Sequence, residues 1–163
     1  MKTLIVYFSK FGNTKRIAEA VAEVMTQAGE ARAVSIDQLA ASDLEGVDLV
    51  VMGSPTHGFT VPPEVRTTLE AQPPGILTGK SVAAFDTTVK PWPLRLLRAS
   101  PKLLRQLQGL GGKPIVRAQT FFVQTRNPQK SGEIDLLLEG ELDRARKWAG
   151  EILRQSTTVV PEK

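Results

Sequence analysis

The alternation of short apolar runs with longer amphipathic stretches is the feature that most restricts the fold of this chain. Four short runs predict strands, and the first and third are apolar on both faces, as in buried parallel sheets. They span residues 3–8, 32–36, 47–52 and 81–85. Two further pieces, residues 115–116 and 121–123, are interpreted as the halves of an interrupted fifth strand.

The stretches between these runs carry apolar residues at helical spacing and predict helices. One helix is predicted to start with Ser100 as its N-cap and Pro101 as its first residue. The others span residues 14–28, 63–71 and 141–153. This order predicts an α/β fold, a doubly wound three-layer sandwich with a five-stranded parallel sheet. The 163 residues suit one domain over residues 1–163.

Composition excludes several kinds of chemistry. The chain has no cysteine, which excludes disulfides, thiolate metal sites and dithiol redox chemistry, so any redox activity requires a cofactor. With one histidine, His57, we expect no metal site. No apolar run is long enough to span a membrane, and the N-terminal run is too short for a signal peptide, which favours a cytoplasmic location.

Ligands of doubly wound sheets bind beyond the carboxyl ends of the strands, where three loops are expected. We call residues 9–14 the first loop, 54–59 the second loop and 86–93 the third loop. In the first loop, helix N-terminal amides, Gly12 and the hydroxyls of Ser9 and Thr14 suit an anion. An ordinary capped helix start is the alternative. Residues 78–81 resemble the end of a P-loop, but Pro74 replaces its first glycine and a strand follows.

Residues 5–14, Ile-Val-Tyr-Phe-Ser-Lys-Phe-Gly-Asn-Thr, closely resemble the signature of the flavodoxin-like family, whose members bind FMN. Residues 53–59, Gly-Ser-Pro-Thr-His-Gly-Phe, resemble the family's loop against the FMN ring, which implies backbone groups of Thr56 and Gly58 near flavin N5. The resemblance implies a short-chain, FMN-binding protein. It assigns to cofactor binding Ser9, Lys10, Phe11, Gly12, Asn13, Thr14, Pro55, Thr56, His57, Gly58, Phe59, Asp86, Thr87, Thr88 and Trp92.

The chain also departs from the family pattern. His57 stands where the family has an aromatic that stacks on the ring, and a solvent-facing loop histidine is the alternative. In the third loop Trp92 is the only aromatic available for stacking, and packing between its two neighbouring prolines is the alternative. Lys90 stands where the family has an acidic cluster.

The net charge of +4 is local in origin. Residues 87–132, the basic segment, hold nine basic residues and no acidic one, whereas the rest has 12 basic and 17 acidic residues. The segment suits an anionic partner, namely NAD(P)H phosphates, a small anionic substrate or an acidic redox protein, and a solvated helix face is the alternative for most of it. The nine are Lys90, Arg95, Arg98, Lys102, Arg105, Lys113, Arg117, Arg126 and Lys130.

Two function classes follow from these observations. The first is an FMN protein of electron transfer, either a carrier or a small NAD(P)H- or quinone-type oxidoreductase. No catalytic residue is assigned, because no side chain there is an evident general acid or base. His57 is the one side chain there that could serve in that role. The second is a flavodoxin-fold binding or regulatory module without flavin. Nucleic-acid binding is not expected, because Phe121 and Phe122 lie in an apolar strand and are unsuited to base stacking. A monomer is favoured.

Overall fold

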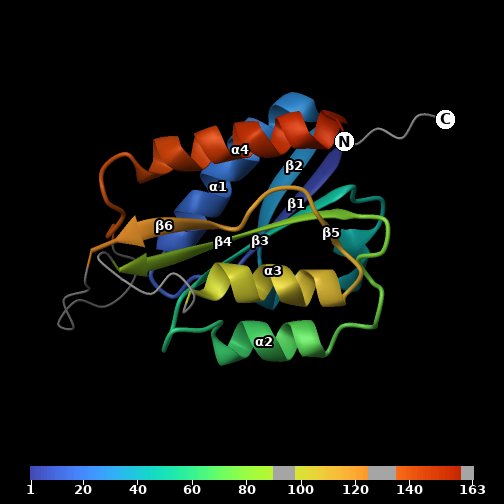
Figure 1. The fold of residues 1–163 in the computed structure, drawn as a ribbon, viewed down its shortest axis with the longest axis horizontal. Coiled ribbons are helices and arrows are strands. Elements are labelled where there is room, and N and C mark those ends of the chain that lie inside the picture. Colours follow the sequence, from blue (N-terminus) through green and yellow to red (C-terminus); the bar gives the residue numbers. More distant parts are fainter. Residues whose placement is uncertain (90–97, 125–134, 159–163) are drawn as a thin grey trace.

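The computed structural model of the chain describes residues 1–89, 98–124 and 135–158. Its strands form one parallel sheet in the order β2-β1-β3-β4-β5, and β6 also pairs with β4. The strands are β1 (Lys2–Tyr7), β2 (Glu30–Ser35), β3 (Leu49–Pro55), β4 (Ser81–Val89), β5 (Lys113–Pro114) and β6 (Gln119–Val123). Because every pair is parallel, the carboxyl ends of the strands meet at one edge of the sheet (Figure 1).

A strand in two pieces is confirmed, but the residues of its first piece were predicted wrongly. Strand β5 pairs with the start of β4, with Lys113 opposite Ser81, and β6 pairs with its end, with Val123 opposite Val89. The first piece is Lys113–Pro114, and the predicted residues 115–116 follow it outside the strand. Ile115 and Val116 are apolar because they pack against the core on the α1/α4 face.

Helices cover both faces of the sheet, as predicted (Figure 1). The helices α1 and α4 pack on one face and α2 and α3 on the other. Their bounds are α1 (Asn13–Met25), α2 (Pro63–Glu70), α3 (Ala99–Gly109) and α4 (Glu141–Thr158). The short 3-10 turns are η1 (Thr26–Ala28), η2 (Ile36–Gln38) and η3 (Ala41–Leu44). None of the described helices is long and apolar enough to cross a membrane.

Three helix ends differ from the prediction. Helix α1 ends at Met25, and the predicted residues 26–28 form the 3-10 turn η1. Helix α3 starts at Ala99, so Ser100 lies inside the first turn and is not the N-cap. The acceptors for the Ala99 N–H come from Thr56 and Asp86, which are distant in sequence. Helix α4 continues to Thr158, beyond its apolar stripe, and the Thr158 hydroxyl donates back to the Arg154 carbonyl.

Aromatic packing on the α1/α4 face supports the carboxyl end of β4. The rings of Phe85, Phe121 and Trp148 meet edge to face, with centroids 5.9 to 6.1 Å apart. Gly53 lies opposite Phe85 in the sheet, and a Cβ at Gly53 would be 2.0 Å from the Phe85 Cζ. The absence of a side chain at position 53 therefore allows Phe85 to pack directly against β3.

Candidate functional site

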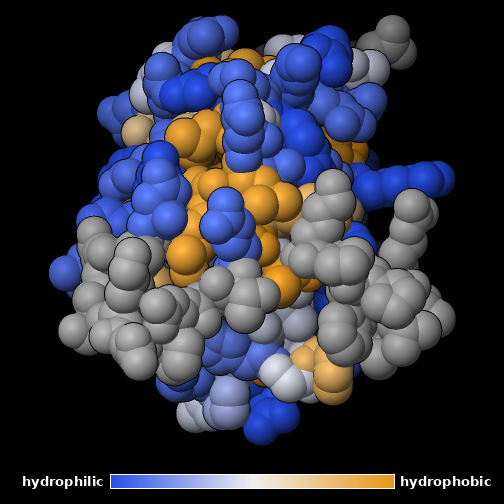
Figure 2. Space-filling view, turned by 90° about the vertical axis from the view of Figure 1, so that its left-hand side faces the viewer, coloured by the Kyte–Doolittle hydropathy of each residue, from blue (hydrophilic) through white to orange (hydrophobic). Residues whose placement is uncertain are grey.

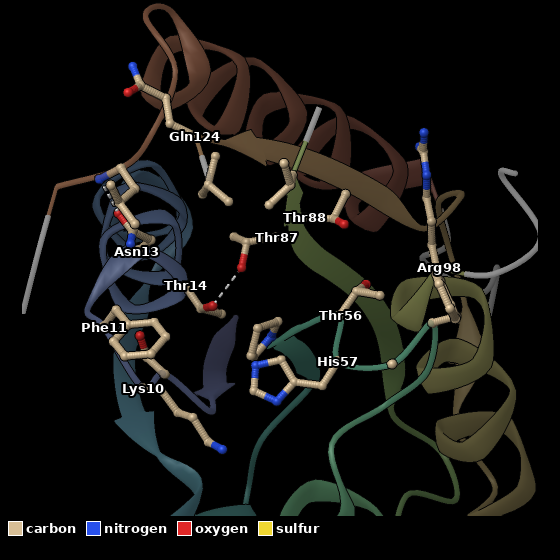
Figure 3. Close-up of a pocket in the computed structure, with 17 residues that line it drawn as sticks. Lys10, Phe11, Asn13, Thr14, Thr56, His57, Thr87, Thr88, Arg98 and Gln124 are labelled. Carbon is tan, nitrogen blue, oxygen red and sulfur yellow. Dashed lines mark hydrogen bonds between the residues drawn. The ribbon is translucent and has the colours of Figure 1, made fainter. Parts of the chain in front are cut away.

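A cavity of about 290 Å³ opens at the carboxyl ends of β1, β3, β4 and β6. Residues from all three predicted loops line it (Figure 3). Of the fifteen predicted residues, all line this cavity except Gly12, Asp86 and Trp92. Gly12 lies at the start of α1 beside it, Asp86 lies behind it, and Trp92 lies outside the described residues, as does Lys90. The sequence motifs therefore converge on one place in the fold.

The first loop places the N-terminus of α1 at the cavity. Gly12 is the N-cap residue and has φ 89°, a left-handed conformation that glycine adopts without strain. Its N–H donates to the Ser9 hydroxyl at 3.0 Å. A glycine N-cap has no side-chain oxygen to occupy the first-turn amides, and the first turn contains no acidic residue. This helix end therefore carries positive potential suited to an anion.

Two polar contacts join the first loop to distant segments. The hydroxyls of Thr14 and Thr87 are 2.8 Å apart, which links α1 to the end of β4 (Figure 3). The Asn13 side-chain oxygen accepts the Leu136 N–H at 2.9 Å, which links α1 to the segment before α4. These two contacts connect the start of α1 to the other side of the cavity.

The second loop ends in a tight two-residue turn. His57 and Thr60 exchange two backbone hydrogen bonds, each 3.0 Å long. Gly58 (φ 52°) and Phe59 (φ 66°) form the turn, and both positive angles are typical of a type I′ turn. A positive φ at Phe59 is strained for a non-glycine residue. The Lys102 ammonium of α3 donates to the Phe59 carbonyl at 3.1 Å, which connects the turn to α3.

His57 lies in the cavity wall and faces Lys10 across the opening (Figure 3). Partial burial lowers the pKa of its imidazole, the Lys10 charge lowers that pKa further, and the Glu64 carboxylate opposes the shift. Lys10 and Glu64 form an exposed ion pair at 3.7 Å. The imidazole is therefore neutral at neutral pH and can both donate and accept a hydrogen bond.

The cavity also contains residues that were not predicted. They are Val89, Arg98, Val123, Gln124 and Leu136. Gln124 directly follows β6, so the rule that ligands bind beyond strand ends would have found it. Leu136 reaches the cavity through its bond to Asn13, for which the sequence has no local signal.

The cavity has two chemically different ends. The first loop contributes polar groups at the start of α1, whereas Val89, Val123 and Leu136 contribute apolar surface from β4, β6 and the segment before α4. Figure 2 shows hydrophobic residues gathered at the centre of this face of the molecule, with hydrophilic residues around them. Among the described residues, no group of three or more histidine and acidic side chains is arranged to hold a metal. The arrangement suits an organic ligand that carries an anionic group at one end.

A doubly wound α/β protein with a ligand cavity at the carboxyl edge of its sheet is the class that these features define. Residues 4–92 match the model of the flavodoxin domain family, and the chain belongs to this family. Its relatives include a flavodoxin from Clostridium saccharobutylicum, 29% identical over 89 residues. That match covers 53% of this chain and 56% of the relative, so the chain matches little more than half of the relative's length.

Solved structures share the fold across almost the whole chain. Oxidised Flavodoxin 1 from Bacillus cereus has a TM-score of 0.73 and 21% identity, over 94% of this chain and 98% of that one. Rubredoxin oxygen:oxidoreductase from Desulfovibrio gigas has a TM-score of 0.73 and 20% identity, over 96% of this chain and 36% of that one. At such low identity these likenesses show the fold alone.

Proposed function

We propose that this chain binds FMN in the cavity and takes part in electron transfer. The observation that carries the proposal is the convergence of the three loops on one cavity, whose lining combines a helix N-terminus with apolar side chains. FMN has matching chemistry, because it combines a phosphate with a planar and largely apolar ring. The flavodoxin from Clostridium saccharobutylicum among its relatives supports the same assignment.

Each part of the cavity has a role in this proposal. Residues of the first loop hold the phosphate through amides at the start of α1 and through the Ser9 and Thr14 hydroxyls. The turn at Gly58 and Phe59 lies against one side of the ring, and the backbone at Thr87 and Thr88 holds its edge. Bound FMN supplies one- and two-electron redox chemistry that no side chain of this chain provides.

FMN binding is tested by titrating micromolar FMN with the protein and following the quenching of flavin fluorescence. We expect saturable quenching, and weaker binding of riboflavin, which has the same ring and no phosphate. Equal affinity for FMN and riboflavin would show that the first loop does not bind the phosphate. No quenching by either would instead favour a binding or regulatory module without flavin.

The choice between a carrier and an oxidoreductase rests on charge and on His57. Arg98 lines the cavity and Lys102 contacts the turn, so two cations of the basic segment lie at or beside the cavity. Their positive charge favours the binding of an anionic substrate or an acidic redox protein. His57, neutral at neutral pH, is the side chain there best suited to hold a proton. Steady-state oxidation of NADH and NADPH with a quinone acceptor separates the two roles, because a carrier alone gives no turnover.

A further inference from the structure

Asp86 is a fully buried acid behind the cavity, with 0% of its surface exposed. Its Oδ2 accepts the Thr56 hydroxyl at 2.6 Å and the Ala99 backbone N–H at 3.1 Å. The Thr56 hydroxyl oxygen also lies 3.0 Å from the Ala99 nitrogen, so that N–H is shared between two acceptors. We call these three residues the Asp86 cluster. Within the part of the chain that the structure describes, the Asp86 Oδ1 has no hydrogen-bond partner.

The cluster joins three elements that surround the cavity. Asp86 belongs to β4, Thr56 begins the turn after β3, and Ala99 is the first residue of α3. Strand β4 ends at Val89, and α3 is the next described element. The Asp86 carboxylate therefore connects the end of β4 both to the start of α3 and to the second loop. Thr56 also donates its N–H to the Thr87 carbonyl at 2.9 Å, which adds a second bond between the same two strand ends.

A buried acid at this position costs folding free energy that an apolar residue would not. Its presence therefore indicates a task that an apolar residue cannot perform. Burial of a carboxylate is unfavourable, and the bonds from Thr56 and Ala99 together with the positive end of α3 offset that cost. The preceding residues Ala84 and Phe85 are apolar and pack in the core. Packing alone would therefore accept an apolar side chain at position 86.

We propose that Asp86 is a positioning residue that fixes the turn at Gly58 and Phe59 against Thr87 and Thr88. Both segments line the cavity, so the distance between them sets the width available to a planar ring. Asp86 thus controls affinity for the ring, whereas the first loop controls affinity for the phosphate. The ring assignment rests on the proposed FMN function, but the positioning of the turn does not.

The binding test compares FMN with riboflavin in matched variants. Thr56→Val removes the hydroxyl that donates to Asp86, and Asp86→Ala removes the carboxylate that accepts from Thr56 and Ala99. We expect each variant to weaken the binding of FMN and riboflavin by the same factor, about tenfold or more. Thr56→Ser keeps the hydroxyl and keeps the affinity, and Asp86→Asn loses less than Asp86→Ala. The double variant is no worse than Asp86→Ala alone. Thr3→Val is the control, because Thr3 also has a buried hydroxyl, unpartnered among the described residues and distant from the cavity.

A second test needs no flavin. Hydrogen exchange of the ligand-free protein is expected to accelerate in Thr56→Val and Asp86→Asn at the amides of Thr56 and Thr60, while core amides such as Val51 keep their protection. Unchanged exchange at these two amides would overturn the proposal, as would a loss of FMN affinity without loss of riboflavin affinity. If the native protein binds neither ligand, the proposed function fails, and the exchange data still decide the role of Asp86.

Discussion

The first loop and the turn of the second loop line the same cavity, yet different kinds of contact determine their shapes. In the first loop, Gly12 takes the positive φ and bonds to Ser9, three residues away. In the second loop a positive φ falls on Phe59, and Asp86 and Lys102 hold the loop from other elements. The first loop is thus shaped mainly by neighbours in sequence, and the second mainly by contacts across the fold.

This difference explains why one loop tolerates strain and the other does not contain it. A loop with the right residue at each backbone angle needs little support from its surroundings. A loop with a non-glycine residue at positive φ persists because surrounding contacts fix its conformation. The following predictions test that distinction, beginning with the largest effect.

Gly53→Ala should have the largest effect, because a Cβ there would lie 2.0 Å from the buried Phe85 ring that packs against β3, directly before the second loop. We expect a loss of about 2 kcal/mol or more in the free energy of unfolding, measured by urea denaturation. The control is Gly109→Ala in α3, where a Cβ would meet nothing within 4 Å. Equal stability of the two variants would show that the Phe85 ring can move aside without cost and does not need the space left by Gly53.

Gly12→Ala tests the local character of the first loop. Alanine at φ 89° should cost about 1 kcal/mol in stability and should weaken FMN more than riboflavin, since the amides at the start of α1 shift. Gly140→Ala is the matched control, because Gly140 also has a positive φ (82°) but directly precedes α4 and not α1. A similar loss of FMN affinity in both variants would contradict the assignment of the phosphate to the first loop.

The comparison of Phe59→Gly with Phe59→Ala should give a smaller difference. The residue is 46% exposed, so both variants lose the burial of about half of it, whereas only glycine relieves the strained φ of 66°. We therefore expect Phe59→Gly to be more stable than Phe59→Ala by about 0.5 kcal/mol in thermal unfolding experiments. Equal stability of the two variants would show that the backbone at position 59 is not strained.

The smallest effect concerns pH. Because burial and Lys10 lower the pKa of His57 in the folded protein from about 6.5, the unfolded chain binds more protons below that value. Stability should therefore decrease slightly as the pH falls through 6.5 and below, and His57 should contribute no pH dependence above it. His57→Gln should lose this part of the slope in urea denaturation followed across that range. An unchanged slope would place the imidazole in solvent and out of the cavity wall.

How far the sequence predicts the structure follows the same division between local and distant contacts. The four main strands and the second piece of the fifth are encoded by residues close together in the chain, and their predicted places are confirmed. The first piece of the fifth strand was placed two residues too late, because the apolar pair Ile115 and Val116 packs in the core outside the strand. The start of α3 was predicted wrongly, because its acceptors come from Thr56 and Asp86. Arg98 and Leu136 were missed as cavity residues for a similar reason, since only the packing of distant elements brings them there.

The backbone groups at the β6 edge of the sheet bear on self-association of the protein through strand pairing. Residues 136–138 run antiparallel beside β6, with Leu138 N–H bonded to the Phe122 carbonyl and Gln124 N–H bonded to the Leu136 carbonyl. The Phe122 N–H is occupied by the Glu141 carboxylate. These backbone groups are therefore closed to strand addition from another molecule, which protects the end of the sheet beside the cavity from aggregation.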